Sequence, residues 1–405
     1  MIRNHNSSYD LYQSFDQSTN RANTASLKYD GRLEMFGKAE IAPLWVADMD
    51  FSAPLAVTQA LVDRANHPVY GYTLYPNSLY EALIDWLKRR HSWQIKHEWV
   101  VLCPGVVSSL HAAVMTFTEP GESVIIQPPI YAPFFSAVTN TGRQIIENPL
   151  HLKNGRYTID FDHLEQCAKH ARLLLFCSPH NPVGRVWSKL ELGHLLDIAR
   201  KYNLIIFSDE IHSDLIYSEN KHHMLAMLAG ESVDVITAVA PSKTFNIPGL
   251  NLAALVVSDK KRRASIIRTL EISHVSAANP FSIVAFEAAY REGETWLNAL
   301  IIYLGDTRDY VEKYLATYLP VIRLIKPEGT YLLWLDCREL GMSDSQLNHF
   351  FVHDANVGMS PGILFGKEGS RFMRMNIGFP RSVIRKALDN IKIAGDRIMA
   401  TINKN

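Results

Sequence analysis

Lys243 is the residue whose type and position point most directly to chemistry. It lies within residues 240–245, where an apolar run ends and before the break at Pro248 and Gly249. In open α/β sheets, ligands bind beyond the carboxyl ends of the strands. A lysine amine desolvated there has a lowered pKa and can attack a carbonyl. A solvated loop lysine is the alternative, and this segment alone favours neither interpretation.

Three further segments follow other apolar runs and offer an acid, an amide and free backbone N–H groups. Asp209 ends one run, where its carboxylate could hold a protonated pyridine nitrogen or cap a helix. Asn181 could donate a hydrogen bond to a phenolate oxygen or belong to a plain Asn-Pro turn. Gly105, Val106 and Val107 begin a helix whose N-terminus suits a phosphate, although a turn without a ligand is commoner.

Four strand ends thus offer an anion site, a hydrogen-bond donor, a carboxylate and a lysine. The four features together are far less probable by chance than any one of them alone. With these motifs the chain resembles fold-type I enzymes that use pyridoxal 5'-phosphate, in the class I/II aspartate aminotransferase superfamily. Within it, residues 43–51 and 71–72 are similar to the MalY/PatB branch of cystathionine β-lyases, or C-S lyases. The similarity is nearly full length, from residues 15–16 to residues 374–380.

The resemblance implies a role for each matching residue around the cofactor ring and the substrate. Lys243 would be the Schiff-base lysine, Asp209 the partner of the pyridine nitrogen and Asn181 the contact to O3' and to substrate. Tyr131 would stack on the face of the cofactor. Arg374 would bind the substrate α-carboxylate in a bidentate fork, for which guanidinium geometry is suited.

The resemblance also implies how the cofactor phosphate is held. Gly105, Val106, Val107 and Ser242 would bind it within one chain. Tyr72 would reach it across the interface of a homodimer and contribute to catalysis, which places the active sites between subunits.

Three further residues are singled out by comparison with the superfamily or with the MalY/PatB branch. His212 stands where better-known aminotransferases have a tyrosine three residues after the aspartate, and we expect it to contact the cofactor. Trp45 and Asp48 mark the MalY/PatB branch and are expected at the substrate entrance. A buried tryptophan and a capping aspartate are the alternatives for these two residues.

The implied activity is carbon–sulfur β-lysis in methionine and cysteine metabolism. The enzyme would cleave L-cystathionine, and also L-cysteine or other S-substituted cysteines, to a thiol, pyruvate and ammonia. A class I/II aminotransferase shares every cofactor contact and is the first alternative. A regulatory protein without the chemistry is the second, and the intact polar set argues against it. No GxGxxG follows the first strand and no GxSxG occurs, which excludes a nicotinamide dehydrogenase and an α/β hydrolase.

The elements that must position these residues follow from hydrophobic periodicity. From about Trp99, short apolar runs alternate with amphipathic segments of helix length, the pattern of βα units and a mostly parallel sheet. Seven strands are predicted, at residues 100–103, 124–127, 144–147, 173–177, 204–208, 235–239 and 252–258. The predicted fold class is therefore α/β, with this sheet between helices.

A smaller α+β domain is predicted to follow the sheet. Its pattern is helical over residues 279–319, alternating over 329–337 and 371–376, and helical again from Arg381. We expect three parts: an N-terminal arm packed on the small domain (1–50), a large domain (51–285) and a small domain (286–405).

Composition limits the partners and the compartment. The 405 residues are 47% hydrophobic, with 41 Lys and Arg against 41 Asp and Glu, and no basic run interleaved with aromatic residues indicates a nucleic-acid partner. The first thirty residues lack an apolar signal region, and no apolar stretch could span a bilayer, so we expect a cytoplasmic protein without membrane contact. The four cysteines show no CxxC spacing and are expected as buried thiols in a reducing compartment, at Cys103, Cys167, Cys177 and Cys337.

The sixteen histidines include one adjacent pair. His222 and His223 are adjacent, so they do not face one metal on a helix, and no HExxH occurs. We therefore expect both side chains on a solvated surface and no bound metal.

Overall fold

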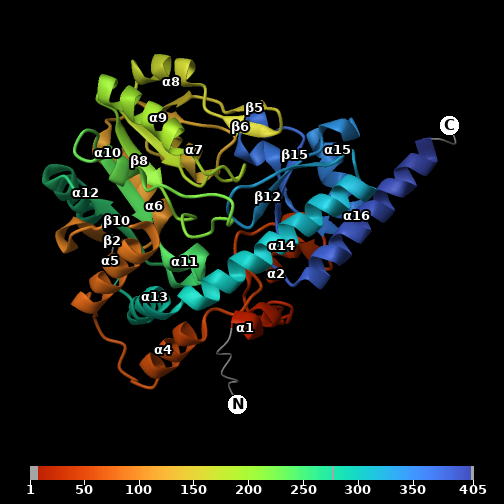
Figure 1. The fold of residues 1–405 in the computed structure, drawn as a ribbon, viewed down its shortest axis with the longest axis horizontal. Coiled ribbons are helices and arrows are strands. Elements are labelled where there is room, and N and C mark those ends of the chain that lie inside the picture. The colour runs from red at the N-terminus through yellow and green to blue at the C-terminus, as the bar shows by residue number, and fades with distance from the viewer. Residues whose placement is uncertain (1–7, 276–277, 403–405) are drawn as a thin grey trace.

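A seven-stranded, mostly parallel sheet lies at the centre of the computed structural model, which describes residues 8–275 and 278–402 (Figure 1). The strands lie in the order β2-β10-β9-β8-β7-β3-β4, and β10 is antiparallel to both of its neighbours. Their bounds are β2 Val100–Cys103, β3 Ser123–Ile126, β4 Gln144–Glu147, β7 Leu173–Cys177, β8 Ile205–Asp209, β9 Val235–Val239 and β10 Ala253–Val257. All seven predicted strands are confirmed, each within one residue.

Helices cover both faces of this sheet. Every residue of β7, β8, β9 and β10 is buried, which explains their continuous runs of apolar residues. One face packs against α6 Val106–Phe117, α7 Pro133–Thr139 and α12 Lys260–Ile272. The other face packs against α8 Phe161–Ala168, α9 Lys189–Tyr202 and α10 Leu225–Ala229. With the faces covered, polar groups at the ends of the strands are the ones that can meet a ligand.

The C-terminal part forms a four-stranded antiparallel sheet in the order β11-β12-β15-β14. Its elements are β11 Arg323–Ile325, β12 Leu332–Asp336, β14 Ser360–Pro361 and β15 Phe372–Asn376, with helices α13 Pro280–Glu292, α14 Glu294–Tyr318 and α16 Arg381–Ile402. The predicted helical stretch is therefore two helices separated by Gly293, and the predicted final helix begins at Arg381 as expected. The division into domains at about residues 50 and 285 stays a prediction.

The N-terminal arm runs along α14 and joins the C-terminal part. Helix α1 (Ser8–Ser14) packs on α14, and the Tyr12 hydroxyl donates to Asp306 Oδ2 at 2.6 Å. Strand β1 (Ala42–Pro43) pairs in parallel with β13 (Val357–Gly358).

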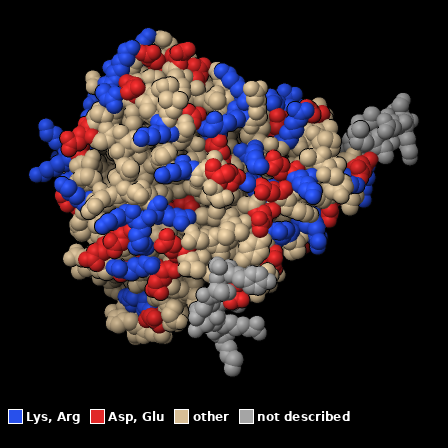
Figure 2. All heavy atoms as spheres, viewed as in Figure 1, with Lys and Arg blue, Asp and Glu red and all other residues tan. Residues whose placement is uncertain are grey.

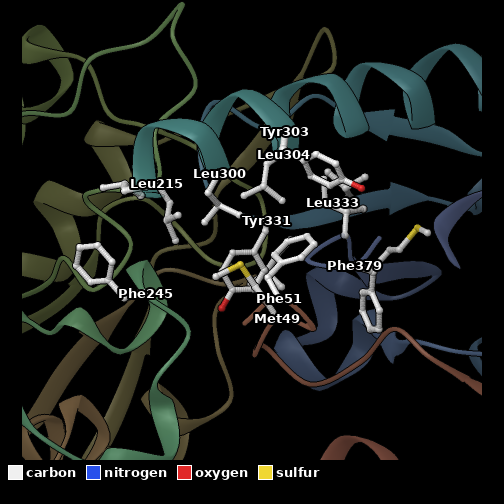
Figure 3. Packing of buried hydrophobic residues seen from close by; sticks show 14 of the residues in the cluster. Met49, Phe51, Leu215, Phe245, Leu300, Tyr303, Leu304, Tyr331, Leu333 and Phe379 are labelled. Atoms are coloured by element: carbon white, nitrogen blue, oxygen red, sulfur yellow. The ribbon is translucent and has the colours of Figure 1, made fainter. Parts of the chain in front are cut away.

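The end of the arm is held by apolar packing. Figure 3 shows Met49, Phe51 and Tyr331 beneath α14, from which Leu300 and Leu304 project toward them. Met49 is 1% exposed and Phe51 4% exposed. Full burial of such side chains contributes roughly 1.5–3 kcal/mol each, so this part of the arm is firmly attached.

A buried charge cluster adds to this attachment. The Lys28 side chain is 0% exposed, and its Nζ lies 2.7 Å from Asp48 Oδ1 and 3.2 Å from Asp50 Oδ1. Arg21 contacts both carboxylates at 2.7 Å. Burial raises the pKa of Asp48, but the hydrogen bonds and charges of Arg21 and Lys28 outweigh burial and leave the pKa below its usual value. Asp48 therefore serves as an ion-pair partner within the arm.

Charged side chains of both signs are interspersed over the face of the molecule drawn in Figure 2. Among the helices of residues 8–275 and 278–402, none is long and apolar enough to cross a membrane.

Replacing Lys28 by alanine should destabilise the protein by about 3 kcal/mol, because the carboxylates of Asp48 and Asp50 lose a buried cation. The unfolding midpoint in urea at fixed protein concentration measures this change. Lys201→Ala is the matched control: Lys201 pairs with Glu165 but is 63% exposed, so its loss should barely move the midpoint. Equal effects of the two substitutions would contradict the role given to Lys28.

Candidate active site

A cavity of about 330 Å³ lies at the carboxyl ends of β7, β8 and β9. The structure brings nine of the predicted residues together in its wall: Gly105, Val106, Val107, Tyr131, Asn181, Asp209, His212, Ser242 and Lys243. The carboxyl ends of parallel strands meet at one edge of a sheet, which is why residues spread over 139 positions, from 105 to 243, line one space.

Lys243 lies in the single turn of α11 (Pro241–Thr244), which follows β9. Its Nζ donates to the backbone carbonyl of Ala47 at 2.6 Å. Burial, together with the nearby charge of Arg374, lowers the pKa of Lys243 to about 8, although Asp48 and Asp209 oppose the shift. A substantial fraction of this amine is therefore neutral near pH 8 and able to act as a nucleophile or base.

Asp209 ends β8 and is 7% exposed. Its Oδ1 accepts the backbone N–H of Ile211 at 3.1 Å. Burial raises the pKa of Asp209 to about 7, although that hydrogen bond and Lys243 lower it. One hydrogen bond only partly offsets the unfavourable burial of this carboxylate. The carboxylate therefore suits a cationic partner such as a protonated ring nitrogen.

Arg374 of β15 forms another part of the site. One Nη donates to Asn181 Oδ1 at 3.1 Å, and the other donates to the Trp45 carbonyl at 3.0 Å and to Ser360 Oγ at 3.3 Å. Burial lowers the pKa of Arg374 to about 10. Its Nε is buried without a hydrogen-bond partner, and no carboxylate of the described residues forms an ion pair with it. This buried, uncompensated guanidinium suits a ligand carboxylate.

The N-terminus of α6 offers an anion site. Gly105 precedes the helix, and the hydroxyls of Ser108 and Ser109 donate to its carbonyl at 2.8 and 2.7 Å. The first N–H groups of a helix have no acceptor within the helix, and the helix dipole favours a negative charge there. A phosphate could therefore bind at the N-terminus of α6, beside Val106 and Val107, on the side of the cavity that holds Ser242.

His212 and Tyr131 complete the wall of the cavity. Burial lowers the pKa of His212 to about 3, so its ring is neutral, and its Nδ1 is buried without a hydrogen-bond partner. Its ring centroid lies 6.1 Å from that of Tyr331. Tyr131 is 37% exposed, and its ring is free to contact a ligand.

Three predicted site residues are not in the lining of the cavity: Arg374, which reaches it through its contact with Asn181, and Tyr72 and Trp45. Tyr72 is fully exposed, in a segment without regular structure. The Trp45 ring packs on Phe36 with centroids 5.5 Å apart, and its Nε1 donates to the Lys28 carbonyl at 3.1 Å. Only the backbone of Trp45 reaches the site, through its contact with Arg374.

The backbone contacts were not found from the sequence. The carbonyl of Ala47 accepts hydrogen bonds from Lys243 and from the Tyr331 hydroxyl, the latter at 2.9 Å. The carbonyl of Trp45 and the hydroxyl of Ser360 hold Arg374. A backbone carbonyl has no side-chain signature, so only proximity reveals this use.

The prediction for His222 is wrong. Its side chain is 2% exposed rather than solvated, and its Nε2 lies 2.7 Å from Glu210 Oε2. Glu210 is fully buried and also accepts hydrogen bonds from Ser208 Oγ and the Leu225 N–H. A buried carboxylate requires such partners, and the loop after β8 folds back to supply them. In the described residues no group of three or more His, Cys, Asp or Glu is placed to hold a metal ion.

Comparisons with known proteins cover almost the whole chain. Residues 40–391 match the model of the family described as aminotransferase class I and II. The chain is 40% identical to cystathionine beta-lyase PatB of Bacillus subtilis (strain 168), with 94% of this chain and 99% of that protein covered. It is 31% identical to protein MalY of Escherichia coli (strain K12), with 92% and 96% covered. The crystal structure of cystalysin from Treponema denticola, which contains a pyridoxal 5'-phosphate cofactor, is 36% identical with a TM-score of 0.92, with 95% and 99% covered.

The lowered pKa of Lys243 can be measured by the pH dependence of amine acylation in cofactor-free protein, followed residue by residue by mass spectrometry. Lys243 should titrate near pH 8, well below an ordinary lysine at about 10.4. Arg374→Met should raise this pKa, because a neighbouring cation is lost. Lys201 is an internal reference, since its hydrogen bond to Glu165 raises its pKa. An ordinary titration of Lys243 would contradict the burial of its amine.

Proposed function

The chain belongs to the aminotransferase class I and II family, and on that premise we propose that it is a pyridoxal 5'-phosphate-dependent carbon–sulfur β-lyase. It cleaves L-cystathionine, and also L-cysteine or other S-substituted cysteines, to a thiol, pyruvate and ammonia. The observation that carries the proposal is the meeting of a low-pKa lysine, a buried carboxylate and an unpaired arginine at one site. The 40% identity to a cystathionine beta-lyase supports lysis over amino transfer.

The residues of the cavity fit the proposed cofactor. Lys243 would bind its carbonyl carbon, and Asp209, with its raised pKa, would pair with the ring nitrogen. The other contacts would come from Asn181, Tyr131, His212, Ser242, Gly105, Val106 and Val107. When bound, the cofactor supplies an electron sink for the electron pair left at the substrate Cα.

The chain's own groups would then orient the substrate and move its proton. Arg374 holds the α-carboxylate, because its guanidinium is buried and charged and forms no ion pair with a carboxylate of the described residues. Lys243, once its amine is free, takes the proton from Cα as general base. The carbonyl of Ala47 is the hydrogen-bond acceptor that keeps this amine in the cavity. The Cβ–S bond breaks and a thiolate leaves.

We also infer a homodimer in which Tyr72 completes the site of the partner subunit. The segment around it exposes apolar side chains: Val69 is 63% exposed, Tyr70 58% and Leu74 76%. Contiguous exposed apolar side chains of this kind mark interaction sites. The position of Tyr72, away from the cavity of its own chain, is consistent with a role across an interface.

A cytoplasmic location is inferred from the cysteines. All four are buried and free in the structure, at Cys103, Cys167, Cys177 and Cys337. Burial raises the pKa of each thiol, which keeps it protonated and unreactive. Such thiols are typical of proteins from a reducing compartment.

Lyase activity is tested by incubating the purified protein with L-cystathionine in the absence of any oxo acid. Pyruvate and thiol should appear in equal amounts, and Lys243→Ala should abolish both the products and the absorbance of the bound cofactor. An aminotransferase shares these cofactor contacts but requires an oxo-acid acceptor to turn over. Dependence of product formation on an added oxo acid would therefore favour the aminotransferase instead.

The dimer is tested by mixing two inactive chains. Tyr72→Ala and Lys243→Ala should each be nearly inactive alone. When the two are co-expressed with different tags and the mixed dimer is purified, one of its two sites has both native side chains. Activity should then return, measured as pyruvate release. A mixed dimer as inactive as its parents would place Tyr72 outside the partner's site.

A further inference from the structure

A second cavity, of about 270 Å³, lies beside the loop that follows β8, and the proposed mechanism does not use it. His91, Asp214 and His222 line it. His91 is the last residue of α5 (Asn77–His91). The cavity therefore lies between the end of α5 and the loop that follows Asp209.

The carboxylate of Asp214 accepts three side-chain hydrogen bonds. Oδ1 accepts from Trp86 Nε1 at 3.1 Å and lies 2.7 Å from His91 Nε2, and Oδ2 accepts from the Thr244 hydroxyl at 2.9 Å. Asp214 is 4% exposed. Burial raises its pKa, but the hydrogen bond and charge of His91 outweigh burial and keep the pKa below its usual value. An ionised, buried acceptor with three donors has one defined geometry.

Thr244 links this carboxylate to the site, because it directly follows Lys243 in the single turn of α11. Asp214 itself lies five residues after Asp209. The carboxylate of Asp214 therefore ties the turn that carries the proposed cofactor lysine to the segment that follows the proposed ring-nitrogen partner. A single helical turn has few backbone hydrogen bonds of its own, so a side-chain link has a large share in fixing its orientation.

Trp86 strengthens the link from the same side. Its indole donates to Asp214 and its ring packs edge-on against Phe245, the residue after Thr244, with centroids 5.6 Å apart. Phe245 is 0% exposed. The turn that carries Lys243 is thus held at two consecutive residues by groups that meet at Asp214.

We propose that Asp214 is a positioning residue, which fixes through Thr244 the orientation of the turn that carries Lys243. The proposal rests on the assignment of Lys243 as the cofactor lysine. A hydrophobic residue at position 214 would fill the same space without the cost of burying a charge. A buried carboxylate that accepts from two elements, α5 through Trp86 and His91 and α11 through Thr244, instead sets the angle and distance between them.

Other charged and titratable groups face Asp214 across the packed elements. Arg90 and His91 come from α5, and Tyr290 comes from α13. The Glu210–His222 pair lies opposite, with the His91 and His222 rings 5.9 Å apart. Removing the Thr244 hydroxyl changes none of these charges, so Thr244 is the residue to alter.

The test compares Thr244→Val with Thr244→Ser in the holoenzyme. Valine keeps the shape and removes the donor to Asp214, whereas serine keeps the donor. Two readouts are the pH midpoint of the bound cofactor's absorbance, recorded without substrate, and kcat and KM separately. Thr244→Val should shift the midpoint by about one pH unit and lower kcat roughly 10- to 100-fold with little change in KM. Thr244→Ser should restore both toward wild type.

Thr118→Val is the matched control. Thr118 is 3% exposed and donates to the Val114 carbonyl at 2.6 Å, at the end of α6 away from the cavity. Thr118→Val should leave both the pH midpoint of the cofactor absorbance and the kinetic constants unchanged. The proposal is overturned if Thr244→Val behaves as wild type, if Thr118→Val has the same effect, or if serine does not rescue.

Failure of the proposed function is distinguishable from these outcomes. A wild-type protein that shows the cofactor band but releases no thiol would overturn the lyase assignment, while the midpoint comparison would still decide the role of Asp214. A wild-type protein that never shows the band after cofactor is added would overturn both.

Discussion

The structure depends on partly desolvating the amine of Lys243 without neutralising it in a salt bridge. Its Nζ donates a hydrogen bond to a neutral acceptor, the carbonyl of Ala47, and desolvation by the surrounding protein lowers its pKa to about 8. A carboxylate in the place of that carbonyl would stabilise the ammonium form and raise the pKa. The choice of a backbone carbonyl therefore keeps the amine reactive while still satisfying its hydrogen bonding.

That carbonyl belongs to the N-terminal arm, so the arm is part of the site. Asn376 Nδ2 donates to the carbonyls of Val46 and Asp48 at 2.6 Å each, on either side of Ala47. Lys28 donates to the Asp48 carbonyl at 2.8 Å. The buried charges around Lys28 thus fix the backbone that receives Lys243, and the same stretch of backbone holds Arg374 through Trp45.

The charges around the cavity are complementary to those of a ligand, because they do not compensate one another within the protein. Arg374 is a buried cation without a carboxylate, Asp209 is a buried carboxylate with a raised pKa, and His212 is neutral with an unpartnered nitrogen. Burial of such groups is unfavourable unless a partner compensates for it. A molecule with a carboxylate, a protonated ring nitrogen and a phosphate would supply those partners, and this is the chemistry expected of an amino acid joined to pyridoxal phosphate.

The sequence by itself determined the seven strands and the polar side chains at their ends, because apolar runs predict buried strands and the ends of parallel strands share one edge. Lys243, Asp209 and Asn181 could be assigned on that basis together with the family resemblance. Only the tertiary structure decided that the Ala47 carbonyl receives the lysine, that Arg374 contacts a residue 329 positions away, and that His222 is buried. These outcomes depend on which segments pack together, and neither a backbone carbonyl nor the burial of a histidine leaves a local pattern in the chain.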